Sequence, residues 1–404
     1  MSAHGPRARP VQRRWWVVAA YAAVSGTNQM LWLTFAPLTT EAAAHYGVSV
    51  DAIGWLSELF PLLYVVLALP AGLALDRWLR PSLALGVGLN AVGAVVRVLS
   101  PVYAGVLVGQ ILIAVAQPLL LAAVTRVVEA SVPAAQRPRA IGIASAGLFA
   151  GMLVALVLGP VFGSERLDAL LLVQAGLTVV AAAAMMLALA RPIWPAGTGA
   201  AAPGVERGGR LRSVLADPVI RSLVLVAGLG FGVFVAVTTW LQALLAPAGI
   251  SADLAGIMLL VMVLAGILAG VLLPEPVIRS GRAVPMLLVV VAVTSGAGLV
   301  LAVLPGPVSG LLAATAYGLA LLGALPVILS LVETHAGAAE ATATGLVWLG
   351  GNLGGIVVSL LVQATLGRPP VAFGLMTAVM LLGIPVLVAL RRRLSTSAPA
   401  ETVP

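Results

Sequence analysis

Long apolar stretches recur along the whole chain and alternate with short polar connections. A helix that spans a bilayer needs ~20 mostly apolar residues. Twelve such stretches can be read, at residues 15–37, 53–75, 82–100, 103–128, 140–162, 168–190, 219–246, 252–273, 284–304, 307–332, 341–366 and 371–390. Because lipid offers no hydrogen bonds to an open backbone, the stretches must be helices. The pattern predicts an all-α integral membrane protein with twelve transmembrane helices.

The composition agrees with a membrane protein and excludes an ordinary soluble domain. The chain is 61% hydrophobic and only 9% charged, whereas soluble domains carry roughly 25% charged residues. A soluble core could not hide this much apolar surface from water.

Basic residues fall mainly in alternate connections. All 22 are arginine, and only Arg97, Arg166 and Arg368 lie in the second set of connections, which leaves 22 − 3 = 19 in the first. Because cytoplasmic connections are enriched in arginine, we expect a cytoplasmic (inner) membrane protein with both termini in the cytoplasm. The net charge of +8 then points to the lipid bilayer as a partner and not to nucleic acid. We also expect the protein to be a monomer.

The longest hydrophilic stretch lies near the midpoint of the chain and suggests how the chain is divided. We expect a cytoplasmic N-terminus (1–14), a six-helix bundle (15–190), a cytoplasmic linker (191–217), a second six-helix bundle (218–390) and a cytoplasmic tail (391–404). Such a linker is typical of a flexible connection between two halves.

The two halves echo each other across this linker. Residues 72–80 close the second span, and a related run at 270–282 closes the eighth. Trp32 in the first span pairs with Trp240 in the seventh. Two pseudo-symmetric six-helix bundles around a midplane site are typical of transporters. Glycines at four-residue spacing (Gly147/Gly151, Gly266/Gly270, Gly350/Gly354 and Gly351/Gly355) predict close helix packing at the seam between the halves.

The run Gly72-x-x-x-Asp76-Arg77-x-x-Arg80 resembles the signature loop of the major facilitator superfamily. The resemblance implies the major facilitator fold and transport of a small molecule by alternating access. We expect a conformational latch at this side of the membrane, formed by Gly72, Asp76, Arg77, Arg80, Glu129 and Glu333.

A narrower resemblance follows from Tyr46-Gly-Val-Ser, Ile53-Gly-Trp-Leu-Ser57, Gly88-Leu-Asn90 and Gly109-Gln110. Residues 13–147 are similar to the feline leukaemia virus subgroup C receptor-related branch of the superfamily, which is associated with choline, ethanolamine and heme transport. The resemblance implies that Trp32 contacts the substrate. Gly147 stands where the branch has a substrate-contacting glutamine, and Asn352 stands where it has a second.

Polar and aromatic residues inside spans are the candidates for substrate binding, since lipid-facing positions do not favour them. Asn28 and Trp32 are four residues apart, as are Trp348 and Asn352, so each pair shares a helix face. The predicted substrate-binding residues are Asn28, Trp32, Gln117, Trp240, Gln242, Tyr317, Trp348 and Asn352. Interhelical hydrogen bonding without any substrate is the alternative for each of them.

Ionisable residues within the spans are few. Glu58 lies about one turn into the second span and Arg97 near the outer end of the third, and both are candidates for coupling. Proton exchange would have to run through Glu58 or not exist, and we expect movement without obligatory proton exchange. The alternatives are that Glu58 faces water at the membrane interface and that Arg97 extends its charged end to the lipid headgroups.

No catalytic arrangement is evident, so we expect no enzyme, no cofactor and no metal site. The chain lacks cysteine, and its three histidines are far apart in sequence. A secondary transporter for a small organic solute, such as a choline-like cation or an amphiphile, is the favoured interpretation. A proton-coupled drug or metabolite exporter and a non-transporting membrane sensor are the alternatives.

Overall fold

The computed structural model describes residues 14–133, 136–162, 166–191, 194, 212, 214–336 and 340–396. Within these ranges the side chains of Asp76, Pro138, Glu333, Glu340, Ala341, Ser395 and Thr396 are not described. Most of the predicted linker 191–217, and the side chains of Asp76 and Glu333 in the predicted latch, therefore lie outside the described part.

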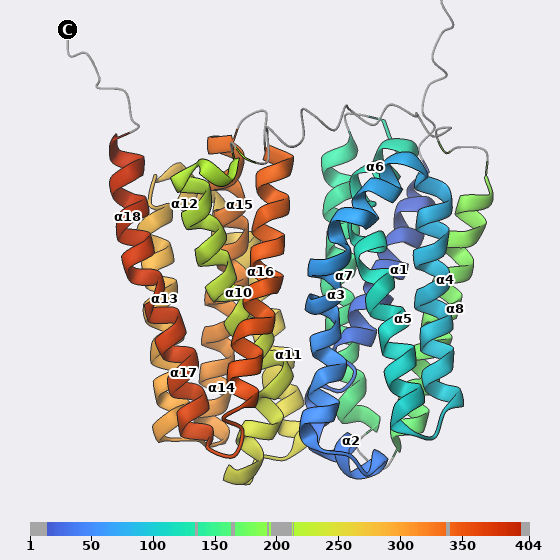
Figure 1. Cartoon of the computed structure of the whole chain (residues 1–404), viewed down its shortest axis with the longest axis horizontal. Coiled ribbons are helices and arrows are strands. Elements are labelled where there is room, and N and C mark those ends of the chain that lie inside the picture. Colours follow the sequence, from blue (N-terminus) through green and yellow to red (C-terminus); the bar gives the residue numbers. More distant parts are fainter. Residues whose placement is uncertain are drawn as a thin grey trace, which may run out of the picture.

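The N-terminal half is a bundle of helices that run along a common direction (Figure 1). Its elements are α1 (Trp15–Trp32), η1 (Ala36–Leu38), α2 (Thr39–Tyr46), α3 (Val50–Arg77), α4 (Leu79–Leu99), α5 (Tyr103–Leu121), α6 (Val124–Ser131), α7 (Arg137–Phe162) and α8 (Leu167–Ala190). The short helices η1 and α2 join the first span to the second at one end of the bundle.

The C-terminal half repeats this plan beside it (Figure 1). Its elements are α10 (Pro218–Leu245), η4 (Ala246–Ala248), α11 (Ala252–Leu272), α12 (Pro274–Arg279), α13 (Ala283–Val303), α14 (Pro307–Tyr317), η5 (Gly318–Leu322), α15 (Gly323–Ala336), α16 (Glu340–Gln363), α17 (Pro369–Leu381) and α18 (Gly383–Thr396). The elements α14, η5 and α15 form one continuous span interrupted by a π-helical turn.

Eleven helical segments of the described chain are long and apolar enough to cross a membrane. The twelfth span is α1, whose apolar character is diluted by Ser25, Thr27, Asn28 and Gln29. Neighbouring helices pack along α1, chiefly α7 and α8, and most of its residues are buried inside the protein, including Ser25, Asn28 and Gln29. Because polar groups covered by protein do not meet lipid, α1 can cross the membrane without being uniformly apolar. The prediction of an all-α membrane protein with twelve transmembrane helices is confirmed.

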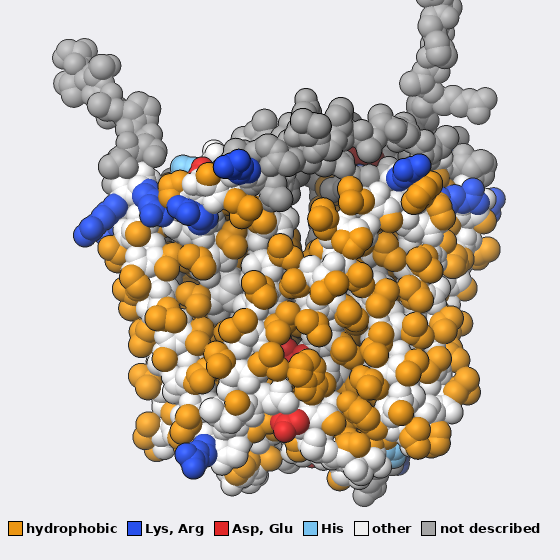
Figure 2. Space-filling view, in the orientation of Figure 1, with side chains coloured by type: hydrophobic (Ala, Val, Ile, Leu, Met, Phe, Trp, Pro, Cys, Tyr) orange, Lys and Arg blue, Asp and Glu red, His pale blue; other side chains and the backbone are white. Residues whose placement is uncertain are grey.

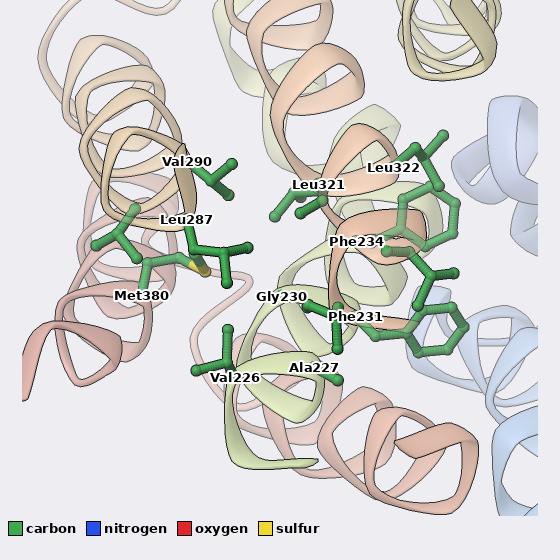
Figure 3. Close-up of a pocket in the computed structure, with 14 residues that line it drawn as sticks. Val226, Ala227, Gly230, Phe231, Phe234, Leu287, Val290, Leu321, Leu322 and Met380 are labelled. Atoms are coloured by element: carbon green, nitrogen blue, oxygen red, sulfur yellow. The ribbon is translucent and has the colours of Figure 1, made fainter. Parts of the chain in front are cut away.

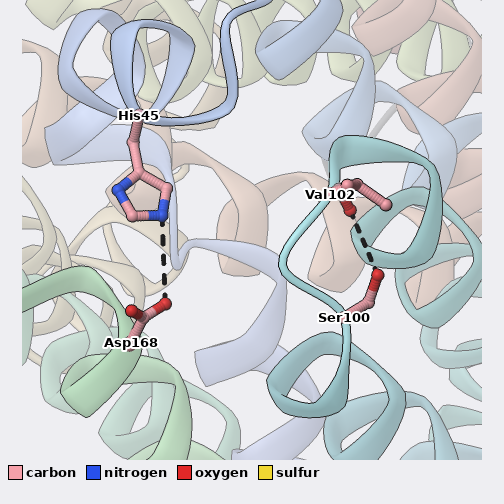
Figure 4. A network of polar contacts seen from close by, with 4 residues as sticks. All are labelled: His45, Ser100, Val102 and Asp168. Carbon is pink, nitrogen blue, oxygen red and sulfur yellow. Dashed lines mark hydrogen bonds and ion pairs between the residues drawn. The ribbon is translucent and has the colours of Figure 1, made fainter.

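The two ends of the bundle differ in charge, and we name them by it. The arginine-rich end carries the described arginines where α3 meets α4, where α6 meets α7 and where α12 meets α13, together with those of α18, and Figure 2 shows basic side chains along this edge. Arg14, just before α1, donates its backbone N–H to the carbonyl of Ser131 at the end of α6, so the chain enters the bundle at this end. The arginine-poor end carries η1, α2 and the α8 N-terminus, where His45 Nε2 lies 3.9 Å from Asp168 Oδ1 (Figure 4).

Glycines pack α1 against α7 and, in the other half, α10 against α16. A Cβ added at Gly151 would lie 1.8 Å from the Gly26 carbonyl oxygen, and one added at Gly354 would lie 2.0 Å from that of Gly228. Gly147/Gly151 and Gly350/Gly354 were predicted at the seam between the halves, which is wrong, because each pair packs inside its own half. Of the other predicted seam glycines, Gly266 and Gly270 line the space between the halves. Gly355 approaches the other half, where an added Cβ would lie 3.7 Å from Pro61.

The equivalent glycine contacts also set the register of the internal repeat. Gly26 corresponds to Gly228, an offset of 228 − 26 = 202 residues. The same offset carries Trp32 to 32 + 202 = 234, which is Phe234. The partner of Trp32 in the repeat is therefore Phe234 and not Trp240, which lies six residues further along α10.

The first span ends earlier than the hydrophobic pattern suggests. The apolar run continues to Pro37, but α1 ends at Trp32 and the chain turns into η1. Pro37 cannot donate a backbone hydrogen bond and disfavours helical geometry at the residue before it. The five residues after Trp32 therefore leave the helical span and lead the chain into η1 at the arginine-poor end.

Candidate solute cavity and its closed gate

A central cavity of about 440 Å³ lies between the two halves. It is lined by α1, α3, α5 and α7 from one half and by α10, α11, η5, α15 and α16 from the other. The lining continues to Leu121, Gly142 and Val271, which lie near the arginine-rich end, and the surface is hollowed between the halves there (Figure 2). The volume falls within the range of ~300–1,000 Å³ common for small-molecule sites.

Aromatic rings form opposite walls of the central cavity. Trp32 and Phe60 pack together in the N-terminal half, with ring centroids 6.1 Å apart. In the C-terminal half, Phe231 contacts Phe234 at 5.7 Å and Trp348 at 6.3 Å, the latter edge to face. A solute in the cavity would therefore meet π faces contributed by both halves.

The polar groups of the cavity wall are uncharged. They come from Gln29, Tyr64, Gln117, Ser145 and Asn352. No acidic or basic side chain occurs among the described residues that line the cavity. The wall can orient a hydroxyl or a carbonyl through hydrogen bonds, and it can attract a soft cation only through aromatic rings.

Four of the predicted substrate-binding residues line this cavity, namely Trp32, Gln117, Trp348 and Asn352. The other four lie elsewhere in this conformation. Asn28 is buried between helices, where its Nδ2 donates to Asn90 Oδ1 (3.0 Å) and to the Ile113 carbonyl (3.1 Å). Tyr317 is buried inside the C-terminal half, near Gly298 of α13.

The remaining two, Trp240 and Gln242, belong to the closed contact between the halves at the arginine-poor end. Trp240 is fully buried, and its indole covers Gly54 of α3 so closely that an added Cβ there would lie 1.8 Å from the ring. Gln242 donates from Nε2 to Thr40 Oγ1 (2.6 Å) and accepts the Thr40 backbone N–H at Oε1 (3.0 Å). Both contacts join α10 to the N-terminal half.

Glu58 lies at the centre of a hydrogen-bond network at this closed contact between the halves. Thr239 Oγ1 lies 3.2 Å from Glu58 Oε1 and donates to it, and the Ser359 hydroxyl donates to the same oxygen. Trp240 Nε1 donates to Ser359 Oγ at 2.8 Å. We call this set the closed gate, and its members are Thr39, Thr40, Gly54, Glu58, Thr239, Trp240, Gln242 and Ser359.

Arg97, the second ionisable residue predicted within a span, is buried in the N-terminal half. Its Nη1 donates to the Leu31 carbonyl (3.3 Å), and its guanidinium lies 5.1 Å from the centroid of Phe35. Leu31 is in the last turn of α1, whose carbonyl groups carry partial negative charge. Arg97 therefore stabilises the end of a helix that terminates inside the protein, and it does not line the central cavity.

The predicted latch residues at the arginine-rich end do not join the two halves in this conformation as far as their side chains are described. The Arg77 guanidinium stacks on Trp78, 4.7 Å from the ring, and Arg80 is exposed. Glu129 pairs with Arg137 at 3.4 Å. A Cβ added at Gly72 would meet open space. The latch therefore stays a prediction for the opposite conformation.

A smaller cavity of about 40 Å³ lies within the C-terminal half (Figure 3). Its wall is apolar and includes Val226, Leu287 and Met380. It shares Phe231, Phe234, Leu322 and Leu325 with the central cavity. This space is too small for an organic solute.

Sequence reasoning missed several residues of the site. Phe60, Tyr64, Phe149, Phe231 and Phe234 line the cavity, and Ser359 completes the closed gate. The glycine-defined register of the repeat could have identified Phe234. Nothing in the sequence marks Ser359, because a single serine in an apolar helix is common and its partner lies 301 residues away.

The chain is similar to known membrane transporters along most of its length. The family model described as Major Facilitator Superfamily matches residues 17–359. Solute carrier family 49 member A3 of Danio rerio is 32% identical over 375 residues, which cover 87% of this chain and 78% of the relative. The choline/ethanolamine transporter FLVCR2 of Homo sapiens is 31% identical over 154 residues, 37% of this chain and 29% of the relative.

Solved structures share the fold at low sequence identity. A bacterial homologue of the human lysosomal transporter Spinster, in an inward-facing and unoccupied conformation, superposes with a TM-score of 0.71 at 17% identity and covers 95% of this chain and 98% of its own. The nucleoside transporter NupG gives a TM-score of 0.66 at 16% identity, with 94% and 99% covered. These matches support the architecture and not the choice of solute.

Proposed function

Because this chain belongs to the major facilitator superfamily and, within it, to solute carrier family 49, we propose that it carries a small organic cation or amphiphile across the membrane by alternating access. The observation that carries the proposal is the central cavity, which both halves line, which is closed at one end, and whose walls are aromatic and uncharged. A quaternary ammonium gains about 0.5–2 kcal/mol per ring from aromatic faces.

The proposed orientation follows from the arginines. The arginine-rich end faces the cytoplasm of an inner membrane, with both termini there. The central cavity then opens inward in this conformation, while the closed gate seals the outer side. Residues 191–217 join the two halves on the cytoplasmic side, and the transporter acts as a monomer.

The choline-transporting relatives support a choline-like solute through Trp32, which lines the cavity. Gly147 argues that the ligand site is not identical to that of these relatives. An added Cβ at this position would lie 2.5 Å from the Ala22 carbonyl of α1, so a glutamine has no room there. We therefore propose the chemical class, a soft cation or a neutral amphiphile with an orienting hydroxyl, without assigning choline itself.

Flux into proteoliposomes tests the proposal. The purified chain is reconstituted and offered labelled choline, ethanolamine, a larger quaternary ammonium and a neutral amphiphile. We expect saturable uptake of at least one cation that a Trp32→Leu/Trp348→Leu double variant loses. Uptake of neutral solutes alone, or cation uptake equal in the double variant, would reject the cation assignment.

A proton-coupled exporter of drugs or metabolites is a second candidate, and Glu58 in the closed gate favours it. An imposed pH gradient separates the two candidates. An exporter of this kind would accumulate solute against its gradient when protons flow the other way, whereas a facilitator would only equilibrate it.

A further inference from the structure

Glu58 is a buried carboxyl group in an incompletely satisfied site. Its side chain is 0% exposed, Oε1 accepts the hydroxyls of Thr239 and Ser359, and Oε2 has no hydrogen-bond partner among the described residues. Both hydroxyls belong to the C-terminal half, whereas Glu58 belongs to α3 of the N-terminal half. The environment of the carboxyl group therefore depends on whether the two halves touch.

Among the described residues of the helices packed against it, no cation neutralises Glu58 in this conformation. The charged residue of α10 is Arg221, eighteen residues before Thr239 and thus about 27 Å away along the helix. The charged residue of α16 is Glu340, nineteen residues before Ser359, so it lies near the other end. Arg97 is directed to the Leu31 carbonyl.

The acidic and histidine side chains of α2 and of the first turn of α3 also lie near the closed gate. Asp51 occupies the first turn of α3 and is exposed, Glu41 of α2 accepts the hydroxyl of Thr40 at 2.9 Å, and His45 is near Asp168. None of them is hydrogen bonded to Glu58. An ionised Glu58 would therefore be a buried charge without a counter-charge, which is far more costly than a buried neutral acid.

We propose that Glu58 is a proton-binding site tied to the closed gate. When the gate is closed, the carboxyl group holds its proton. When the halves part at the arginine-poor end, Thr239, Trp240 and Ser359 leave with the C-terminal half and water reaches Glu58. The O–H bond then breaks, the proton passes to water on that side, and the carboxylate remains on α3.

This inference rests on the alternating access of the proposed function but not on the identity of the solute. Any proton exchange was expected to run through Glu58 or not exist, and the closed gate links proton binding at Glu58 to the conformation of the two halves. Each return to the inward-facing conformation would take up one proton from the arginine-poor side. The ratio of the two conformations would then change with pH by at most about tenfold per unit, the limit for one proton.

Single-cysteine labelling tests the proposal, since the natural chain has no cysteine. Thr39→Cys reports on the closed gate, where the Thr39 side chain is 1% exposed and its Oγ1 lies 3.5 Å from the Thr239 carbonyl. Ser145→Cys reports on the central cavity. Each reporter is made in the natural background and with Glu58→Gln, and both are labelled with a polar maleimide across a pH series without solute. The matched background removes the pH dependence of the thiol itself.

We expect labelling of the Thr39→Cys reporter, relative to its Glu58→Gln counterpart, to rise with pH and approach tenfold per unit. Labelling of the Ser145→Cys reporter should fall in parallel. An identical pH dependence in both backgrounds would overturn the proposal. So would a pH dependence that Glu41→Gln or Asp51→Asn abolishes while Glu58→Gln leaves it intact.

A second variant keeps the test decisive if Glu58→Gln folds poorly. Ser359→Ala keeps the acid and removes one donor to it. The closed gate should then label faster at every pH, and the dependence on pH should remain. Loss of that dependence in a variant that retains Glu58 would contradict the proposal. Failure to transport any cation in proteoliposomes would reject the solute class and leave this result standing.

Discussion

Trp32 donates its indole N–H to the backbone carbonyl of Ser57, 3.1 Å away. The residue that would normally donate to this carbonyl within α3 is four positions later, where Pro61 has no N–H. Trp32 thus satisfies an acceptor that a helix-interior proline leaves open. A single side chain both forms the cavity wall and supports α3 one residue before Glu58.

Substitutions at Trp32 should separate these two roles. Trp32→Phe keeps a π face but leaves the Ser57 carbonyl unpaired, which costs about 1–3 kcal/mol of stability. Trp32→Leu loses both, so a cation should bind about 0.5–2 kcal/mol more weakly to this variant than to Trp32→Phe. Thermal unfolding measures the first effect, and cation binding by calorimetry measures the second. Equal cation affinity in both variants would mean that the ring only fills space.

Gly54→Ala should hold the gate open. The added methyl group would lie 1.8 Å from the Trp240 ring, so the indole cannot seat on α3. We expect faster labelling of the Thr39→Cys reporter and slower labelling of the Ser145→Cys reporter. Replacing the indole with a smaller side chain, in a Gly54→Ala/Trp240→Val variant, should allow the gate to close again in part. Unchanged labelling in Gly54→Ala would show that this packing does not hold the gate.

Two glycines of α7 should respond in opposite directions to alanine. Gly151→Ala would place a methyl group against the Gly26 carbonyl and should destabilise the fold by about 1–3 kcal/mol. Gly142→Ala meets nothing within 4 Å and should be neutral or stabilise by about 0.5–1 kcal/mol. Melting temperatures of the two variants in the same detergent test this contrast. Equal melting temperatures would contradict the close contact of α1 with α7.

The predicted latch can be tested through Asp76. Asp76→Asn should favour the conformation that is open at the arginine-rich end, by about 1–3 kcal/mol on the scale of conformational couplings. The expected result is slower solute exchange together with faster labelling of the Ser145→Cys reporter. Glu129→Gln is a useful comparison, because Glu129 pairs with Arg137 in the present conformation. If Asp76→Asn leaves the labelling unchanged, the latch hypothesis is wrong.

The hydrophobic pattern alone determined the membrane class, the number of spans and the two-half arrangement. Lipid permits few solutions for a chain with long apolar stretches, so period and length suffice. The same pattern misplaced the end of α1. Residue identity suggested the pairing of Trp32 with Trp240, but the backbone contacts of Gly26 and Gly228 decide the register.

The tertiary structure decided which polar and aromatic residues line the central cavity. Asn28 and Gln117 look alike in sequence, yet Asn28 is used between helices and Gln117 lines the cavity. Glu58 was visible as a rare intramembrane acid, but its partners Thr239 and Ser359 are 181 and 301 residues away. Local sequence fixes which face a side chain occupies on its own helix. What that face meets depends on how the helices of the two halves pack.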